Sequence, residues 1–305
     1  MRSGFNCYVG TAALCCPEKR RIMKKPSGKW ITEPYKGTLL GFTMRKKIYD
    51  KRSKFQRIEV YETLRNGKIL LLDGCFMLTE KEEFVYHEMI AHVPLFAHPN
   101  PKRVLVIGGG DGGTVREVLK HKCVKSVDFV EIDREVIKVS KKYFKGLTSW
   151  MNNKKEKRVN INCTDGCRFV KAKKNYYDVI LIDSTDPVDI GFVLFTKDFY
   201  RNVRKALRKN GIVVAQTEDP FYGGHLIRSI NKRIRSAFGK KNTSLYLASV
   251  PTYPSGTWSF TFASRKTTPL TIRNKKTKSV RVKYYNKAVH KAAFALPEFV
   301  KELVE

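Results

Sequence analysis

The sequence predicts an α/β fold in which a seven-stranded, mostly parallel sheet follows a small N-terminal antiparallel β-domain. Residues 30–78 alternate apolar with polar side chains between turn signals, as half-buried antiparallel strands do. Arg103–Glu117, RVLVIGGGDGGTVRE, passes from an apolar run through a turn with five glycines into a helical pattern. Such a stretch is typical of a nucleotide-binding strand–turn–helix unit. After this turn, strand-like and helix-like stretches alternate, which indicates crossovers with helices on both faces of the sheet.

The composition is that of an ordinary folded protein except for its charge. The chain has 305 residues, 42% of them hydrophobic, which is enough for one main domain with a smaller annex. Its formal net charge of +32 attracts polyanions. Because the basic residues are spread along the chain without interleaved aromatics, we prefer solvation by lysine, with only non-specific nucleic-acid contact. No apolar run reaches the roughly 18 residues that span a bilayer, so no membrane partner is expected.

Cysteine usage and the N-terminal segment indicate a cytoplasmic protein. Seven cysteines, an odd number without a matching second pair or nearby histidines, predict neither a disulfide framework nor a zinc site. Reduced thiols with packing roles are therefore expected. Residues 1–28 contain an apolar run too short for a signal peptide, so we interpret them as a variable extension, with secretion as the alternative.

The domain boundaries follow from changes in these patterns. Residues 29–79 form the predicted N-terminal β-domain, 80–270 a Rossmann-like catalytic domain, and 271–305 a basic C-terminal tail with a helix. Turn signals in the first domain fall at Lys36-Gly37, Asn66-Gly67 and Asp73-Gly74. Helical spacing begins at Glu80, and this helix is expected to end at Pro94, Pro99 and Pro101.

Seven strand-like runs and five helical stretches are expected after Arg103. The runs start near Val104, Val127, Val159, Val179, Ile212, Leu245 and Trp258. The helical stretches are Gly113–His121, Arg134–Phe144, Gly166–Lys173, Thr196–Arg208 and Gly224–Phe238. Seven strands suit a methyltransferase-type sheet better than a dehydrogenase sheet. In either case a ligand lies beyond the carboxyl ends of the strands.

Acidic residues follow four of these strands. Asp111 lies inside the glycine turn, where it would repel a pyrophosphate, so the ligand is expected to be neutral or cationic there. Glu131 and Asp133 end the second strand, Asp165 follows the third, and Asp183 follows the fourth in LIDSTDP. Each alone has a structural explanation as a cap or turn residue. Because four strand ends converge on one crevice and carboxylates repel one another there, the sequence predicts a site for a polycation.

These residues resemble the polyamine aminopropyltransferases, the spermidine synthase family. The resemblance covers the chain from about Trp30 to the C-terminus. Its motifs are Tyr86–His121, Val130–Asp133, Leu181–Pro187, Thr217–Tyr222 and Pro251–Arg265. Two departures stand out. The segment after the fourth strand reads DPVDIG where many members have Gly-Pro after DPV, and residues 1–28 have no counterpart that we identify.

The resemblance implies transfer of the aminopropyl group of decarboxylated S-adenosylmethionine to a diamine. Putrescine is the default acceptor, which would give spermidine and methylthioadenosine. Asp183 is the candidate general base, and Tyr86 would orient the attacking nitrogen. No metal or resident cofactor is implied, since decarboxylated S-adenosylmethionine is a co-substrate. Family members are commonly homodimers or homotetramers.

The resemblance also assigns binding residues. The implied donor-binding residues are Gln56 and Glu131 at the ribose, Asp165 at the adenine, Asp111 at the ammonium, and His87, Gly108 and Gly166 beside them. The implied acceptor-binding residues are Tyr86, Asp183, Asp186, Tyr253 and Trp30. For His87 a packed helix histidine, and for Tyr253 a turn tyrosine, remain alternatives. Residues 184–195, with the unusual Asp189, are expected to form a lid.

Other activities remain open at this point. Agmatine, cadaverine, spermidine or a longer amine would satisfy the same acids, because the sequence does not give the channel length. An S-adenosylmethionine-dependent methyltransferase could use the same fold, although a neutral loop would be expected in place of Asp111. A non-catalytic protein that binds nucleic acid through its charge is the third hypothesis.

Overall fold

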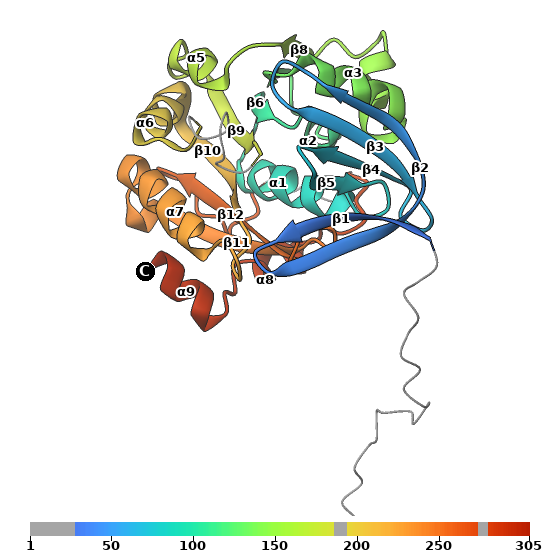
Figure 1. The fold of residues 1–305 in the computed structure, drawn as a ribbon. Coiled ribbons are helices and arrows are strands. Elements are labelled where there is room, and N and C mark those ends of the chain that lie inside the picture. The colour runs from blue at the N-terminus through green and yellow to red at the C-terminus, as the bar shows by residue number, and fades with distance from the viewer. Residues whose placement is uncertain (1–27, 186–193, 274–279) are drawn as a thin grey trace, which may run out of the picture.

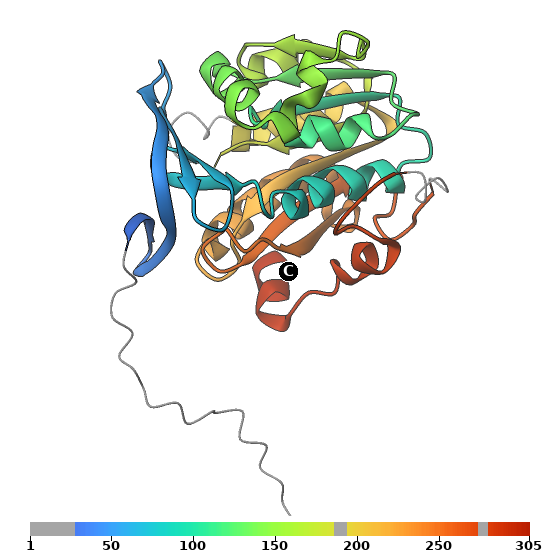
Figure 2. The ribbon, with the colours of Figure 1, turned by 90° about the vertical axis from the view of Figure 1, so that its right-hand side faces the viewer.

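A computed structural model of the protein describes residues 28–185, 194–273 and 280–305. Two sheets organise this part of the chain, an N-terminal five-stranded sheet and a seven-stranded sheet flanked by helices (Figure 1). Figure 2 shows the five-stranded sheet standing at one side of the helical and seven-stranded body. No helix within these described ranges is long and apolar enough to cross a membrane.

The N-terminal sheet is an antiparallel meander in which each strand pairs with the next, as the sequence predicts. Its strands are β1 (Lys29–Tyr35), β2 (Thr38–Arg52), β3 (Arg57–Thr63), β4 (Lys68–Leu72) and β5 (Cys75–Thr79). The turns fall at the three expected dipeptides. Gly37, Gly67 and Gly74 have φ of 86°, 71° and 85°, in the left-handed region that glycine enters without strain.

The second sheet has the order β11-β12-β10-β9-β6-β7-β8. Its strands are β6 (Arg103–Gly108), β7 (Ser126–Val130), β8 (Val159–Asn162), β9 (Tyr177–Asp183), β10 (Leu207–Glu218), β11 (Thr243–Ser249) and β12 (Thr257–Ser264). The five neighbouring strands β10, β9, β6, β7 and β8 run parallel to one another. Strand β12 is antiparallel to both of its neighbours, β10 and β11. All seven expected strands are present. The largest difference is in β10, which begins at Leu207 rather than near Ile212; Leu207 pairs with Tyr177 before a register shift.

Helices cover both faces of this sheet. On one face lie α1 (Phe84–Ala97), α2 (Gly113–Leu119) and the tail helix α8 (Lys287–Ala292). On the other face lie α5 (Gly166–Lys171), α6 (Lys197–Ala206) and α7 (Gly224–Phe238), and α9 (Glu298–Val304) packs on α7. Helix α3 (Arg134–Tyr143) and the short α4 (Lys145–Thr148) bury Val136, Val139 and Leu147 against the N-terminal sheet. This contact places the N-terminal sheet over the carboxyl end of β7.

Two details of the helices differ from the sequence prediction. Helix α1 does not stop at Pro94 but continues through it to Ala97, and the His98 N–H bonds to the Pro94 carbonyl. Pro94 lies in the last turn. Because proline has no N–H, the helix lacks only one hydrogen bond there. The tail contains two short helices, α8 and α9, rather than one.

Candidate active site

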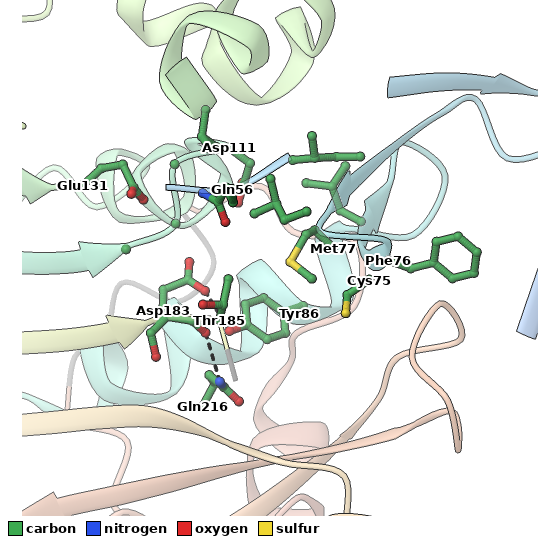
Figure 3. A pocket seen from close by; sticks show the side chains of 18 of the residues that line it. Gln56, Cys75, Phe76, Met77, Tyr86, Asp111, Glu131, Asp183, Thr185 and Gln216 are labelled. Carbon is green, nitrogen blue, oxygen red and sulfur yellow. Dashed lines mark hydrogen bonds between the residues drawn. The ribbon is translucent and has the colours of Figure 1, made fainter. Parts of the chain in front are cut away.

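A deep pocket lies where the carboxyl ends of β6, β7 and β9 face the N-terminal sheet. Its empty volume, including the open mouth, is about 1530 Å³. Strand-end residues of the large sheet form one wall, and Phe76 and Met77 of β5 form part of the opposite wall (Figure 3). The position beyond the carboxyl ends of parallel strands is the one that the fold class predicts for a ligand.

The glycine turn allows β6 and β9 to approach closely at the pocket floor. Gly108 and Gly109 have φ of 79° and 69°. A Cβ atom on Gly108 would lie 2.2 Å from the carbonyl oxygen of Asp183, and one on Gly109 would lie 2.4 Å from the Asp183 carboxylate. Only glycine therefore fits beside Asp183 at these positions.

Asp183 ends β9 with its carboxylate fixed by two hydroxyl donors. The Tyr86 hydroxyl donates to Oδ1 at 2.7 Å, and the Thr114 hydroxyl donates to Oδ2 at 2.6 Å. Burial raises the pKa of Asp183, and the negative charge of nearby Asp111 raises it further, against the two hydrogen bonds. The group is thus oriented and made more basic than an ordinary aspartate.

Asp111 lies in the turn between β6 and α2. Its Oδ1 accepts the Gly113 N–H at 2.7 Å and lies 3.1 Å from His87 Nε2. Burial, the largest single effect, would raise the pKa of Asp111, but the charge of His87, its hydrogen bond and the Gly113 N–H together outweigh burial and hold the pKa below its ordinary value. Asp111 is therefore a carboxylate at neutral pH.

His87 is held between two carboxylates. Its Nδ1 lies 2.6 Å from Glu83 Oε2, and its Nε2 faces Asp111. Both ring nitrogens must donate to make both contacts, so the ring is an imidazolium. Burial alone would lower the pKa of His87, yet the charge of Asp111 and the hydrogen bonds to both acids raise it to about 10.

Glu83 is in turn fixed from behind by Arg116. The guanidinium donates to both Glu83 oxygens at 2.8 and 2.7 Å, and its Nε donates to Glu117 at 2.8 Å. Burial opposes ionisation of Glu83, but His87 and Arg116 lower its pKa to about 2. The helices α1 and α2 are thereby joined by a buried chain of charges that ends at the pocket.

Another part of the pocket carries the acids of β7. Glu131 is buried, and its Oε1 accepts the Asp133 N–H at 2.9 Å. Burial raises the pKa of Glu131 to about 7. Gln56 reaches over from the N-terminal sheet and donates to Asp133 at 3.1 Å. Asp165 lines the same pocket and caps α5 by accepting the Arg168 N–H at 2.7 Å.

One wall, formed by β1, the start of α1 and the segment from the β11–β12 loop into the start of β12, combines aromatic rings with acids. Tyr86 and Tyr253 meet edge to face at 5.9 Å, and Tyr253 packs on Trp258 at 4.4 Å between ring centroids. Glu33 and Glu82 line the pocket and are less than 10% exposed. Burial raises the pKa of each. Among the described residues, Glu82 Oε2 is a buried oxygen without a hydrogen-bond donor.

The structure thus brings most of the expected site residues together. Around one pocket lie Gln56, Tyr86, His87, Gly108, Asp111, Glu131, Asp165, Gly166, Asp183 and Tyr253. Trp30 is not among the pocket residues, because it lies on β1 with its side chain 42% exposed, and Glu33 and Tyr35 of that strand line the pocket instead. Asp186, Asp189 and most of the expected lid lie outside the described residues.

Sequence reasoning missed several residues of the site. Thr114 follows the glycine turn directly, and a hydroxyl side chain at that position is a signal that could have identified it as a site residue. Glu82 and Glu83 belong to the run TEKEE, which is indistinguishable from an exposed helix start. Gln216 lies near the end of the buried strand β10, and its side chain donates to the Ser184 carbonyl at 2.9 Å (Figure 3).

One ligand atom each from His87, Asp111 and Asp183 lie within 4.8 Å of one another, a spacing that a metal ion could bridge. In the observed arrangement, however, both nitrogens of His87 donate to carboxylates, which leaves no lone pair for a metal. The two carboxylates are better suited to an ammonium group, which supplies its own N–H donors.

Comparison with known proteins agrees with this site. Residues 83–275 match the family model of the spermine/spermidine synthase domain, and residues 29–80 match that of the spermidine synthase tetramerisation domain. The polyamine aminopropyltransferase of Caldicellulosiruptor saccharolyticus is 49% identical over 90% of this chain and 98% of its own. That of Bacillus subtilis is 45% identical over 90% and 99%.

Solved structures give the same result. A spermidine synthase crystallised with the transition-state analogue AdoDATO has a TM-score of 0.84 at 42% identity, covering 94% of this chain and 98% of its own. The spermidine synthase of Thermotoga maritima has a TM-score of 0.84 at 41% identity, covering 95% and 99%. The chain therefore belongs to the spermine/spermidine synthase family, a family of aminopropyltransferases.

Proposed function

We propose that the protein transfers the aminopropyl group of decarboxylated S-adenosylmethionine to a diamine, with putrescine as the default acceptor. The observation that carries this proposal is the pairing of Asp111 with Asp183 at the pocket floor, where ligand atoms of the two carboxylates lie within 4.8 Å. Two largely shielded carboxylates this close repel each other, and a cationic ligand between them relieves the repulsion. The ammonium and sulfonium groups of the donor supply such charge.

The donor orientation follows from the other acids of the pocket. Glu131 and Gln56 lie where β7 ends and would bind the ribose hydroxyls. Asp165 would accept a hydrogen bond from the adenine amino group, and Gly108 and Gly166, which line the same pocket, would lie beside the nucleoside. The aminopropyl ammonium would then lie at Asp111.

Asp183 would act as general base. The acceptor nitrogen must lose one proton before it attacks the aminopropyl carbon next to sulfur. The new C–N bond forms as the C–S bond breaks, and methylthioadenosine leaves with the electron pair as a neutral thioether. Asp183 takes the proton, while the Tyr86 hydroxyl, 2.7 Å from its Oδ1, orients the carboxylate and the amine. The displacement itself depends mainly on in-line positioning.

The acceptor would extend from Asp183 along the aromatic wall. Tyr86 and Tyr253 offer ring faces to methylene groups and ammonium ends. Glu33 and Glu82 add two buried carboxyl groups on the same wall, and an acceptor with more than one cationic nitrogen would favour their ionised form. Agmatine, cadaverine, spermidine and longer amines share this property and are the alternatives. The roles expected for Asp186 and Trp30 in acceptor binding remain predictions.

The same geometry argues against a methyltransferase. S-adenosylmethionine carries an additional carboxylate, which Asp111 and Asp183 would repel in the pose proposed for the donor. A pocket for the intact molecule would need a neutral or cationic group at one of these positions.

Two further assignments belong to this proposal. The match of residues 29–80 to a tetramerisation domain supports a homotetramer or homodimer. We also assign the protein to the reducing cytoplasm, which fits the free thiol of Cys163.

An acceptor panel tests the proposed function. Purified protein is incubated with decarboxylated S-adenosylmethionine and putrescine, cadaverine, agmatine or spermidine, and the products are identified by mass spectrometry. We expect methylthioadenosine and one aminopropylated amine in equal amounts, with putrescine converted fastest. Methyl transfer from intact S-adenosylmethionine, or no turnover of any amine, would refute the proposal.

A further inference from the structure

A second hollow of the molecule is lined almost entirely by cations. Its eight lining residues include Lys174, Arg201, Arg204, Lys205, Lys209 and Arg265, and the other two are Asn175 and Leu207. All six cationic residues are exposed. We call this surface the basic groove. Six like charges in one concave surface repel one another, so an anionic ligand would stabilise the arrangement.

The basic groove lies at the edge of the large sheet opposite the active site. Lys174 precedes β9, Lys209 lies near the start of β10, and Arg265 follows the end of β12. Asp183, in contrast, lies at the carboxyl end of β9. A ligand in the basic groove therefore leaves the active-site mouth open.

The charges of the basic groove are mostly not neutralised by the protein. Arg201 pairs with Asp198 at 2.8 Å. None of the other five cations forms an ion pair with an acid in the described ranges. Arg204 and Lys205 lie three and four residues after Arg201, so both neighbour Arg201 on one side of α6. The groove thus presents a row of charges rather than a single anion-binding point.

We propose that the basic groove binds the phosphate backbone of RNA without sequence preference. A concave row of cations can follow a linear polyanion, whereas a flat anionic membrane meets only the rim of a hollow. Leu207, the one large apolar lining residue, is buried and cannot insert into lipid. No aromatic residue lines the groove, so bases have no stacking platform there. RNA binding at this surface would account for part of the net charge of +32, which has no role in the transferase reaction.

The test compares two variants with the same loss of charge. Arg204→Gln/Lys205→Gln/Lys209→Gln removes three cations from the basic groove. The matched control, Lys141→Gln/Lys142→Gln/Lys145→Gln, removes three exposed lysines clustered at α3 and α4. Binding of a labelled single-stranded RNA of about 20 nucleotides is measured by fluorescence anisotropy over a range of salt concentrations. The melting temperature and the turnover of the transferase reaction are measured alongside. Each variant should keep the parent's values of these two quantities.

The two variants should differ clearly in their affinity for RNA and in its salt dependence. Contact with six phosphates predicts a slope of log K against log salt of about −4 for the parent, falling to about −2 in the groove variant. At about 0.1 M salt the groove variant should bind at least about tenfold more weakly, and the control within about threefold of the parent. Equal losses in both variants, or a parent that does not bind RNA, would overturn the proposal. So would binding to phosphatidylserine vesicles in place of RNA.

Discussion

His87 and Asp111 form a buried ion pair at the pocket floor, with 3.1 Å between Nε2 and Oδ1. The pair is completed by Glu83, which accepts from Nδ1, and Glu83 is held by Arg116. An ammonium that reaches Asp111 must therefore share this carboxylate with an imidazolium. The arrangement keeps Asp111 ionised and in place before the ligand arrives, so the charge does not have to be organised during binding.

The first prediction concerns the pH dependence of stability. The pKa of His87 is raised to about 10 in the folded protein from 6.5. A raised pKa stabilises the fold fully below about pH 6.5, and this contribution is lost as the pH rises towards 10. His87→Gln should therefore lower the free energy of unfolding by on the order of 2 kcal/mol more at pH 6.5 than at pH 9.5. Urea denaturation of both proteins at the two pH values measures this, and an equal cost at both would contradict an imidazolium.

Removing the charge of Asp111 should weaken donor binding selectively. Asp111→Asn keeps an oxygen for the Gly113 N–H, which Asp111→Ala would lose. We expect the Kd for decarboxylated S-adenosylmethionine to rise about 100-fold, because a charged hydrogen bond is lost. Isothermal titration calorimetry measures it. Methylthioadenosine, which lacks the ammonium, is the control ligand and should bind as to the parent; a similar loss for both ligands would place the effect elsewhere.

The sequence alone was sufficient for the fold because its signals are local. The glycine turn and the apolar runs identify each strand of the large sheet, and the dipeptides identify the hairpin turns. Where a local rule failed, packing decided: α1 continues through Pro94 because its buried last turn needs only one hydrogen bond less.

The site was predictable only as far as its motifs reach. Asp111, Asp183 and Tyr86 lie in distinctive stretches, so resemblance could assign them. The bond between Glu83 and Arg116 joins residues 33 positions apart on two helices, and no periodicity reveals that pairing. Trp30 was assigned by position in a loosely aligned strand, and a shift of a few residues along β1 replaces it with Glu33 and Tyr35 at the pocket.

Tyr86→Phe should change the pH profile as well as the rate. The Tyr86 hydroxyl donates to Asp183 and lowers its pKa, against burial and the charge of Asp111, which raise it. Loss of this donor should raise the Asp183 pKa further and move the acid limb of kcat to higher pH. We expect kcat to fall by about 10- to 100-fold near neutral pH, less than the full 10²- to 10⁴-fold of general acid–base catalysis, because Asp183 itself is kept. A reduced kcat with an unmoved acid limb would mean that Tyr86 acts on the substrate alone.

A side chain at Gly108 should destabilise the fold. Its φ of 79° and the 2.2 Å approach of a Cβ to the Asp183 carbonyl leave no room for alanine. Gly108→Ala should lower the free energy of unfolding by about 2–4 kcal/mol. Gly146→Ala is the control, since nothing lies within 4 Å of its Cβ position. A cost no greater than that of the control, in urea denaturation, would contradict the close approach of β6 and β9.

Removing the charge of Glu82 should weaken binding of the acceptor's far ammonium without changing the reaction at its attacking nitrogen. Glu82 Oε1 accepts from Thr79 and Thr252, so Glu82→Gln preserves these contacts and removes only the charge. Because this carboxylate would attract the far ammonium, KM for putrescine should rise about tenfold with kcat little changed, a loss of about 1.4 kcal/mol in binding free energy. The monoamine butylamine has no far ammonium, and its kinetics should not change. Glu80→Gln is the matched control, because Glu80 pairs with Lys68 and does not line the pocket. An equal rise in KM for butylamine would mean that Glu82 maintains the shape of the pocket rather than attracting the ammonium group by its charge.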